Sequence, residues 1–477
     1  MPRFVSSSDE STDAAIRARI VTTVAGSVDA HVGHDGRLAV ALSGGRDSVV
    51  LLDALAQLAA TRSLALFAIH VHHGLSSNAN AWAQFCAALC RARNIGFTVC
   101  RVDVARAGRL SLEAEARRVR YAALADAALK QALSHIALAH HQDDQAETLL
   151  LQLLRGAGPH GLAAMPQMRR DSRHVVWLRP LLGIARSEID SYAAVRKLRF
   201  IDDESNLDRR YLRNALRTTV LPALKAIAPQ AVPTLARAAA HQGEAALLLD
   251  DLAAFDATSA FDGATLERAL LRGLAPHRAR NLLRWFLRQH GLSAPSTARL
   301  TAMLAQLNHA RSDARVTLAH AGTEIGVHHG RIVVHAPAPP AYSVSWAGQD
   351  VLALPHGTLA FERTPGHGIA AERLSAVPVT VRARKGGERL QLASGRPRRA
   401  LKSILHEAGV PEWQRRGLPL LFCGDELAAV PHLGVDIAYQ ASGTALGFTL
   451  RWEPKPLWRP APIATEPISP RKRPPCE

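Results

Sequence analysis

A run of small and polar residues, Ser43-Gly44-Gly45-Arg46-Asp47-Ser48, stands between an apolar segment, RLAVAL, and a helical pattern, SVVLLDALAQL. Two glycines let the backbone wrap closely around a phosphate, and a helix N-terminus directs free N–H groups and partial positive charge at it. The hydroxyls of Ser43 and Ser48 add donors, whereas an ionised Asp47 is suited to holding Mg²⁺ beside phosphates. The run therefore predicts that residues 43–48 bind a nucleotide phosphate; a tight turn without a ligand is the alternative.

This loop lacks the signatures of two common nucleotide folds, the Gly-Lys-Ser/Thr of a Walker A loop and the G-x-G-x-x-G of a dinucleotide fold. It resembles instead the SGGxDS loop of the PP-loop ATP pyrophosphatases, enzymes that cleave ATP between the α and β phosphates to adenylate a substrate. The resemblance implies ATP and Mg²⁺ as cofactors.

A second polar cluster, AHHQDDQAET at 139–148, follows the apolar segment HIALAH and opens another helical pattern. Strands of a parallel sheet end on one edge, so these acids are expected to reach the phosphate loop. Asp144 and Glu147 are three residues apart and share a helix face. Both are predicted to be catalytic, with Asp144 also a metal ligand, although the spacing does not rank it against Asp143. Acids that only offset the helix dipole are the alternative.

Two further groups of potential ligands do not form a recognisable metal site. His70, His72 and His73 follow another apolar run, but their spacing matches no common zinc pattern and no cysteine pair accompanies them. Cys86 and Cys90 are four residues apart on a helical pattern, where small apolar side chains most simply face the core. The sequence argues against a zinc or iron–sulfur centre.

Two arginines of EAEARRVRYAAL, Arg117 and Arg120, are three residues apart and share a helix face with Glu113. Guanidinium groups hold phosphates bidentately, so Arg117 is predicted to clamp an adenylate or a nucleic-acid phosphate. Ion pairing at the surface is an equal alternative.

Alternating apolar and helical segments, from Arg37 to about Asp203, must position these clusters. The apolar runs RLAVALSGG, LALFAIHVHH, FTVCRVDV and HIALAHH are rich in Val, Ile, Leu and Ala, as strands buried on both faces are. The segments between them have helical periodicity. The predicted fold class is α/β: a parallel-sheet PP-loop nucleotide-binding domain, followed by a helical domain and a small α+β C-terminal domain.

Beyond Tyr211 the strand patterns give way to helical segments that run to about Arg311. In HRARNLLRWFLRQHG, an apolar stripe and an arginine row occupy separate faces, and Gly291 stands where a C-cap belongs. The arginine row is equally a solvated face or an RNA contact. The stripe consists of Leu282, Leu283, Phe286 and Leu287, and the row of Arg280, Arg284 and Arg288.

The predicted domain organisation follows these changes of pattern and of proline content. A β-rich stretch at 314–334 precedes HAPAPPAYS, which reads as a stiff linker, and the final proline- and charge-rich run is too polar to pack. The predicted boundaries are 1–36 for an N-terminal extension and lead-in helix, 37–220 for the catalytic domain, 221–335 for a mainly helical domain, 336–377 for a linker region, 378–450 for a C-terminal domain and 451–477 for a disordered tail.

The chain carries a formal charge of +17, which favours a polyanionic partner because each Lys or Arg placed on a phosphate releases counterions. A basic surface kept for solubility is the alternative. Five irregularly placed cysteines argue for a reducing compartment, and neither a signal peptide nor a membrane-spanning stretch is recognisable. These features predict a cytoplasmic protein with no membrane association and imply no stable protein partner.

Longer segments resemble the tRNA(Ile)-lysidine synthetase family over nearly the whole chain. They are AIHVHHGLSSNANAWAQFC, EAEARRVRY, AHHQDDQAETLLLQLLRGAGPHGLAAM, RPLLGIARSEIDSYA and FIDDESNLDRRYLRNALR. The last carries the family-like Asn206, Asp208, Tyr211, Arg213 and Asn214, of which Arg213 is expected to stabilise the activated intermediate.

The resemblance implies a two-step reaction on the wobble cytidine of a minor tRNA(Ile) with a CAU anticodon. ATP adenylates the C2 carbonyl oxygen and releases pyrophosphate, after which the amine of free L-lysine attacks C2 and expels AMP. Asp144 and Glu147 are the expected carboxylates that bind the lysine ammonium and accept its proton.

The C-terminal region resembles the tRNA-binding module of the same family, through VRARKGGERL and PRRALKSILHEAGVPEWQRRGLPLLFCGDELAAV. Glu388 stands where Asp is expected, a conservative departure. Basic residues here are predicted to contact tRNA phosphates: Arg382, Arg384, Lys385, Arg398, Arg399, Lys402, Arg415 and Arg416.

Two other functions compete with this interpretation. Another PP-loop enzyme, such as a tRNA thiolase or an amide-forming synthetase, would bring a Cys-x-x-Cys pair or a glutaminase nucleophile, and neither is recognisable in the sequence. A non-catalytic RNA-binding protein with a relict loop would have no need of Asp47, Asp144 and Glu147.

Overall fold

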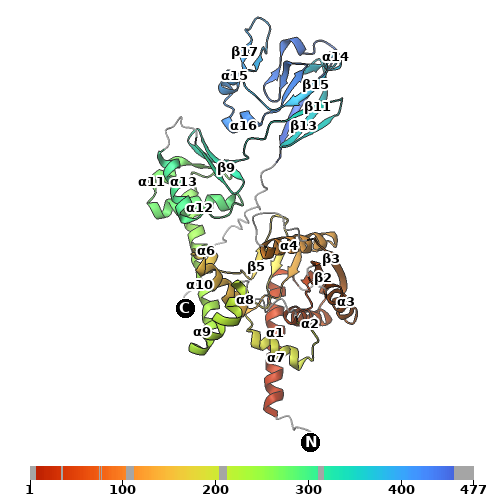
Figure 1. Cartoon of the computed structure of the whole chain (residues 1–477), viewed down its shortest axis with the longest axis vertical. Coiled ribbons are helices and arrows are strands. Elements are labelled where there is room, and N and C mark those ends of the chain that lie inside the picture. Colours follow the sequence, from red (N-terminus) through yellow and green to blue (C-terminus); the bar gives the residue numbers. More distant parts are fainter. Residues whose placement is uncertain are drawn as a thin grey trace, which may run out of the picture. The chain divides into compact units, whose positions relative to one another are not determined.

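The computed structural model describes residues 7–33, 36–74, 76, 78–103, 112–202, 212–309 and 316–455, and their side chains apart from those of 7–12 and 112–114. The chain forms two compact units, of which the first ends at Leu249 and the second begins at Asp250, within helix α10 (Ala231–Ala257) (Figure 1). Among the described helices, none combines the length and apolarity that crossing a membrane requires.

The first unit is built on a six-stranded sheet of order β3-β2-β1-β4-β6-β5. The four predicted strands, β1 to β4, are parallel, β6 adds a fifth parallel strand, and β5 runs antiparallel to β6. The reversal follows from the short connection between these two strands, since a parallel pair needs a crossover of a dozen residues or more. The strands are β1 (Arg37–Ala41), β2 (Ala65–His72), β3 (Gly96–Arg101), β4 (His135–Ala137), β5 (Met168–Arg170) and β6 (Val176–Leu178).

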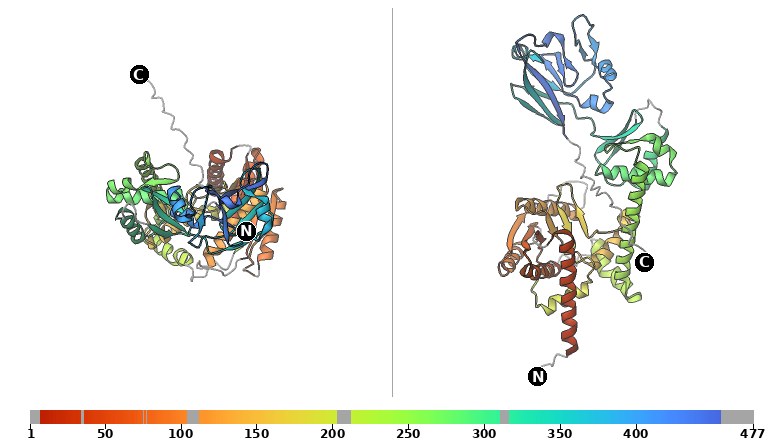
Figure 2. Two further views of the ribbon diagram at one scale, coloured as in Figure 1. Left: turned by 90° about the horizontal axis from the view of Figure 1, so that it is seen from above. Right: turned by 180° about the vertical axis from the view of Figure 1, so that it is seen from behind.

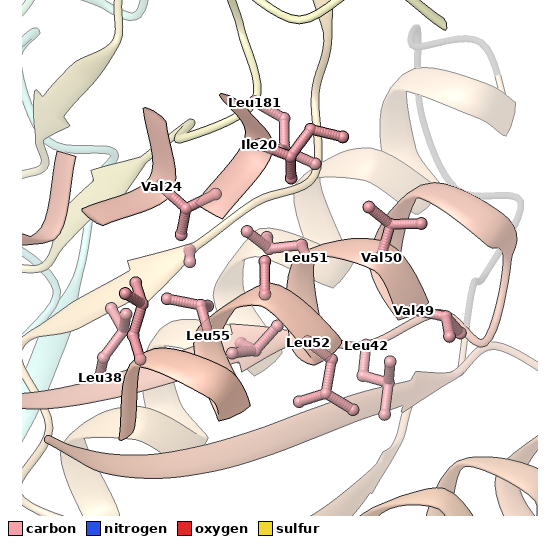
Figure 3. Close-up of a cluster of buried hydrophobic side chains, with 14 of the residues drawn as sticks. Ile20, Val24, Leu38, Leu42, Val49, Val50, Leu51, Leu52, Leu55 and Leu181 are labelled. Carbon is pink, nitrogen blue, oxygen red and sulfur yellow. The ribbon is translucent and has the colours of Figure 1, made fainter. Parts of the chain in front are cut away.

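Helices cover both faces of this sheet, because its strands alternate apolar side chains between two cores. Leu38 and Val40 of β1 enter one core, with α1 (Ser7–His31), α2 (Arg46–Thr61), α3 (Ala79–Arg91) and α7 (Arg186–Val195) (Figure 3). Ala39 enters the other, beneath α4 (Leu112–Lys130). The predicted lead-in helix is therefore part of the first core, where α1 packs against α2 and α7; Figure 2 shows it from behind.

The carboxyl ends of the parallel strands open onto one edge of the sheet. The phosphate loop follows β1, and α5 (Gln142–Leu154) begins just after β4. A chain of short helices then completes the unit: α6 (Pro159–Leu162), α8 (Leu212–Ala215), a π-helical turn (Leu216–Val220) and α9 (Leu221–Ile227). The strands β5 and β6 were not predicted from the sequence, because three residues are too few to show a period.

The first part of the second unit packs helices on a four-stranded sheet of order β7-β10-β9-β8. The predicted amphipathic helix is confirmed, since all four residues of its apolar stripe are fully buried and Gly291 has a φ of +67° just beyond the helix end. The elements are β7 (Thr265–Glu267), α11 (Arg268–Gly273), α12 (Pro276–Gln289), α13 (Thr297–His309), β8 (Thr317–His320), β9 (Thr323–His328) and β10 (Arg331–His335).

The prediction of a linker over 336–377 is wrong for most of its length, because strands from 343 onward enter the C-terminal core. β13 pairs with β21 over nine residues, from Gly357 opposite Pro454 to Pro365 opposite Leu446. Trp452, assigned from the sequence to the tail, is buried in the same core. The predicted disorder beyond residue 455 lies outside the described residues.

The secondary structure of this C-terminal part is mainly antiparallel β, with a five-stranded and a four-stranded sheet and a β16-β17 pair. Its elements are β11 (Ser343–Trp346), β12 (Val351–Leu354), β13 (Gly357–Pro365), β14 (Ile369–Ala370), α14 (Ala371–Ala376), β15 (Val379–Arg382), β16 (Arg389–Leu390), β17 (Arg399–Ala400), α15 (Leu401–Glu407), α16 (Glu412–Gly417), β18 (Leu420–Cys423), β19 (Glu426–Val430), β20 (Gly434–Val435), a 3₁₀ turn (Ile437–Tyr439) and β21 (Leu446–Pro454).

Candidate active site

The loop after β1 has the backbone that its glycines suggest. Gly44 has a φ of +90°, and a Cβ built on it would lie 2.6 Å from Cδ1 of Ile201 and 3.1 Å from Sγ of Cys86. The N–H of Ile201 donates to the carbonyl of Gly44 at 2.9 Å, which ties the loop to the segment after α7. Only glycine satisfies both the backbone conformation and the space at position 44.

The serines of the loop hold one another and the backbone. The hydroxyls of Ser43 and Ser48 are 3.0 Å apart, and the N–H of Gly45 donates to Oγ of Ser43 at 3.2 Å. Arg46 instead turns toward protein partners, with an ion pair to Asp190 and its guanidinium 4.7 Å from the ring centre of Phe200. The part of Arg46 that remains suited to a phosphate is its backbone N–H in the first turn of α2.

Asp47 meets the second predicted cluster through His141. Nε2 of this fully buried histidine lies 3.7 Å from Oδ2 of Asp47 and 3.5 Å from Oδ2 of Asp144. Oδ1 of Asp47 is buried and has no hydrogen-bond partner among the described residues. Burial raises the pKa of Asp47, and the negative charge of Asp144 raises it further. The structure thus brings the phosphate loop and the acids of α5 together, as the shared sheet edge predicted.

Two arginines form hydrogen-bonded ion pairs with the acids of α5. Arg213 donates to Glu147 at 2.9 Å and to Asp144 at 3.0 Å. Arg217 donates to Glu147 at 2.6 Å and to Asp144 at 3.1 Å. Burial of Asp144 opposes its ionisation, but the positive field of His141 and Arg213 and the hydrogen bond from the His141 N–H bring its pKa down to about 2. The cluster is therefore a compensated four-charge network.

Asp143 points away from this network. Its Oδ2 accepts the N–H of Arg186 at 3.0 Å, and its Oδ1 pairs with Nζ of Lys225 at 2.9 Å. Its two oxygens are thus turned toward α7 and α9, whereas Asp144 shares with Asp47 a contact to Nε2 of His141. This geometry favours Asp144 over Asp143 as the acid that acts with the phosphate loop.

His140 is affected by charges of both signs, from Asp144 and from several arginines. Its pKa is lowered to about 3, chiefly by burial, with Asp144 opposing and Arg179, Arg117 and Arg213 reinforcing the shift. The imidazole is therefore neutral at physiological pH. Arg117 itself donates to the hydroxyl of Tyr121 at 3.2 Å.

The histidines and cysteines beside the loop serve the protein's own packing. His70 contacts the carbonyl of Leu42 at 2.8 Å, and His72 contacts Asn80 at 3.1 Å. Burial raises the pKa of Cys86 to about 12 and that of Cys90 to about 11, so neither is a reactive thiolate. Across the described residues, no group of three His, Cys, Asp or Glu side chains is arranged to hold a metal ion.

Sequence reasoning missed two cations of this site. Arg217 follows Arg213 by four residues in LRNALRTTV, a spacing that pointed to a shared helix face. Lys225 carried no local signal, because its partner Asp143 lies 82 residues away. The family-like Asn206, Asp208 and Tyr211, and the side chain of Glu113, lie outside the described residues.

The basic residues of the C-terminal region differ in how far they are neutralised. Five pair with carboxylates: Arg384 with Glu388, Arg398 with Asp436, Arg399 with Glu407, and Arg415 and Arg416 with Glu412. Among the described residues, Arg382, Lys385 and Lys402 have no carboxylate partner, and Arg382 lies over the ring of Phe422 at 3.6 Å. These three are the free charges of the predicted set.

Glu388, the residue at which Asp was expected, closes the turn before it. Its Oε1 accepts the N–H groups of Lys385 at 2.6 Å and Gly386 at 2.7 Å. Gly386 and Gly387 have φ of +101° and +85°. Since the longer side chain still caps the turn, the departure leaves the local structure intact.

Comparisons with known proteins agree with this architecture. Residues 18–224 match the model of the PP-loop domain, residues 266–333 that of the TilS substrate binding domain, and residues 379–452 that of the TilS substrate C-terminal domain. A tRNA(Ile)-lysidine synthase of Nitrosomonas europaea is 43% identical over 441 residues, which cover 90% of this chain and 94% of the relative.

Other relatives give the same result. A tRNA(Ile)-lysidine synthase of Burkholderia pseudomallei is 40% identical, covering 93% of this chain and 97% of the relative. One from Azoarcus sp. is 40% identical, covering 89% and 93%. With a PP-loop ATP-binding domain and both TilS domains in one chain, this protein belongs to the tRNA(Ile)-lysidine synthase family of ATP-dependent ligases.

Proposed function

We propose that the chain joins free L-lysine to C2 of the wobble cytidine of a minor tRNA(Ile) with a CAU anticodon. In the first step the C2 carbonyl oxygen bonds to the α-phosphorus of ATP, and pyrophosphate leaves. In the second, the lysine ammonium gives one proton to a carboxylate, the free amine bonds to C2, the C2–O bond breaks and AMP leaves, and the nitrogen gives up a second proton to solvent. The product, lysidine, pairs with A instead of G and changes the tRNA's identity from methionine to isoleucine.

One observation carries the proposal: the loop carboxylate Asp47 and the acid pair of α5 meet at His141, with 3.7 Å to Asp47 and 3.5 Å to Asp144. The first step transfers adenylate to the oxygen on C2 and the second brings an amine to C2 itself, so the phosphate-binding and amine-binding groups must lie in one site. A relict nucleotide loop would have no reason to keep a buried, unpaired carboxylate oxygen, Oδ1 of Asp47, near a second acid, since such burial costs stability.

The ATP site is assigned to residues 43–48. The open turn at Gly44 and Gly45 and the first N–H groups of α2 direct donors at the phosphates, and Ser43 and Ser48 add hydroxyls. Positive potential at this position stabilises the charge that develops on the α-phosphate during transfer. The side chain of Arg46 anchors the loop to Asp190 of α7.

Asp47 and Asp144 are suited to Mg²⁺. Oδ1 of Asp47 is a buried carboxylate oxygen without a hydrogen-bond partner among the described residues, and hard oxygen ligands are those that Mg²⁺ prefers. When bound, the ion would neutralise phosphate charge. The charge of Asp144 beside Asp47 would then favour the cation instead of raising the pKa of its neighbour.

The lysine ammonium is assigned to Asp144 and Glu147. In the structure both acids are held by guanidinium groups, so an entering ammonium competes with one of them. We assign that exchange to Arg213, which becomes free to stabilise the adenylated intermediate. A pKa near 2 makes Asp144 a good partner for cations and a weak proton acceptor, so acceptance of the proton is assigned to Glu147.

The remaining assignments concern tRNA and compartment. We assign tRNA phosphates to the C-terminal basic set, with Arg382, Lys385 and Lys402 foremost because they are not neutralised by neighbouring acids. Residues 221–335 are assigned to tRNA binding as well. The cytoplasm is the proposed location, since ATP, lysine and tRNA occur there together.

Pyrophosphate and AMP report the two steps separately, which makes the proposal testable. With tRNA and ATP but no lysine, the wild-type protein should release up to one equivalent of pyrophosphate, and AMP should follow only after lysine is added. Asp47→Ala should lose both signals, whereas Glu147→Gln should keep the pyrophosphate burst and lose AMP.

The matched control is Asp126→Ala, a surface acid on α4 whose partner Arg173 lies at 2.6 Å. Its two signals should equal those of the wild type. Full activity in a folded Asp47→Ala variant, or equal activity on a tRNA whose wobble cytidine is replaced by uridine, would contradict the proposal.

A further inference from the structure

A pocket of about 330 Å³ opens between α4, β5 and β6, and its lining is almost entirely cationic. It is formed by Arg117, Arg118, Tyr121, Arg169 and Arg179. Arginine guanidinium groups present planar sets of donors that match phosphate and carboxylate oxygens. The pocket thus has the chemistry of an anion site.

The positive charge of this arginine pocket is largely uncompensated. Arg118 pairs with Glu115 at 2.9 Å, but Arg117, Arg169 and Arg179 have no carboxylate partner within the part of the chain that the structure describes. Three like charges in one hollow repel each other, so a folded protein keeps them together at a cost. An anionic ligand would remove that cost.

Arg179 forms the floor of the pocket and is only 5% exposed. Its Nη1 donates to the carbonyl of Pro166 at 2.7 Å, while its buried Nε has no hydrogen-bond partner among the described residues. Leaving a buried charged donor unpaired costs more than a neutral one. A bound anion would supply the acceptor that Nε of Arg179 lacks among the described residues.

The rim of the pocket is organised around one aromatic ring. Tyr121 packs on Trp177 with ring centres 4.7 Å apart. The guanidinium carbons of Arg117 and Arg169 lie 5.2 Å and 6.0 Å from the centre of the Tyr121 ring. Both arginines are exposed to solvent. The pocket is thus reachable by a large ligand, with exposed donors at the mouth and a buried donor below.

The pocket lies at the same sheet edge as the reaction site. Arg179 directly follows the carboxyl end of β6, and β6 neighbours β4, whose end leads to His140 and Asp144. Arg179 and Arg117 also lower the pKa of His140, which places their charge close to that residue. The arginine pocket and the acids of α5 thus belong to neighbouring strand ends of one sheet.

We propose that the arginine pocket binds backbone phosphates of the tRNA next to the nucleotide that reacts, with Arg179 as the buried contact and Arg117 and Arg169 as the outer ones. The inference rests on the proposed function for the identity of the RNA. A ribose–phosphate chain that delivers its base to Asp47 and Asp144 must carry its neighbouring phosphates along this edge. Three unpaired cations exceed what the single carboxylate of lysine requires, whereas consecutive phosphates match them.

Adjacent residues of β5 provide a matched test. Arg169 lines the pocket, and Arg170 lies on the opposite face of the strand, so Arg169→Gln and Arg170→Gln remove the same charge one position apart. Affinity for the CAU tRNA is measured by filter binding over a salt series, without ATP or lysine. Arg169→Gln should weaken binding about tenfold and reduce the slope of log K against log salt by about 1. Arg170→Gln should stay within about twofold of the wild type, because Arg170 does not line the pocket.

A chemically altered RNA identifies the phosphate. Neutral methylphosphonate linkages on either side of the wobble cytidine should weaken wild-type binding, and Arg169→Gln should then add no further loss, as expected for two changes to one contact. Arg179→Lys keeps the charge but lacks the Nε donor, so it should bind about fivefold more weakly at a temperature where the variant is still folded. If it fails to fold, the Arg169 cycle still decides.

Two results would overturn the inference. Equal affinities for Arg169→Gln and Arg170→Gln would show that the pocket does not touch tRNA. A raised KM for lysine with unchanged tRNA affinity would assign the pocket to the amino-acid carboxylate. The affinity assay uses neither ATP nor lysine, so it tests the pocket independently of the reaction. If Arg169→Gln and the methylphosphonate RNA behave as expected but the protein incorporates no lysine, the proposed chemistry is wrong and the assignment of the pocket to tRNA still holds.

Discussion

The phosphate loop makes a quantitative prediction for Gly44→Ala. A non-glycine residue at φ +90° pays about 1–2 kcal/mol for left-handed backbone. Its Cβ would also lie 2.6 Å from Cδ1 of Ile201, an overlap of the kind that costs about 1–3 kcal/mol when a packed core must shift. The sum is about 2–5 kcal/mol, which corresponds to a melting temperature lower by roughly 4–20 °C for a unit of this size.

Calorimetry measures this loss, and two variants separate its causes. Gly45→Ala is the control, because Gly45 has a φ of −71° and its nearest neighbour to a new Cβ is Oγ of Ser43 at 3.5 Å. Its stability should stay within about 1 kcal/mol of the wild type. Ile201→Val removes the clashing Cδ1. The double variant Gly44→Ala/Ile201→Val should therefore regain the stability lost to the overlap and still lack the stability lost to the left-handed backbone.

ATP affinity should follow the same order as stability. A displaced turn at position 44 misdirects the N–H groups of the loop, so Gly44→Ala should bind ATP more weakly, as titration calorimetry with the intact chain would show. A Gly44→Ala variant that melts within 1 °C of the wild type and binds ATP equally well would refute the reasoning about this turn.

Four further outcomes follow from the charged groups. Because burial raises the folded-state pKa of Asp47 above 3.8, its ionisation costs stability at higher pH, so Asp47→Asn should be more stable than the wild type at pH 7 and equal to it below about pH 4 in urea unfolding. Asp144 has the opposite sign: with a pKa of about 2 it stabilises the folded state above its ordinary value of 3.8, and Asp144→Asn should lose about 2 kcal/mol at pH 7, a difference that disappears as pH falls toward 2. Asp436, fully buried, accepts two backbone N–H groups and an arginine, so Asp436→Ala should destabilise the C-terminal part by about 3 kcal/mol and weaken tRNA binding without changing ATP affinity. Lys402→Gln should reduce the salt slope of tRNA binding by about 1, and Arg399→Gln by less, because Arg399 already pairs with Glu407; equal slopes would argue against tRNA contact at Lys402.

The sequence alone determined the elements whose signal is local. A strand buried on both faces needs a continuous apolar run, and a phosphate turn needs glycine at fixed positions. The strand RLAVAL and the turn Ser43–Ser48 could therefore be predicted without knowing what they contact. The same reasoning joined Asp47 to Asp144, because the ends of parallel strands share one edge. The apolar stripe of α12 was equally clear from its 3.6-residue period.

Tertiary structure decided what depends on partners far along the chain. Asp143 and Asp144 are adjacent and chemically identical, and only the approach of Lys225 to one and of Arg213 to the other separates them. Strand β13 looked like part of a linker because its pairing partner β21 begins at Leu446, and such distant pairing leaves no period in the local sequence. Arg169 and Arg179 likewise form a pocket only because β5, β6 and α4 lie together in the fold. A sequence shows which residues are charged, but only the structure shows whether an opposite charge lies beside them.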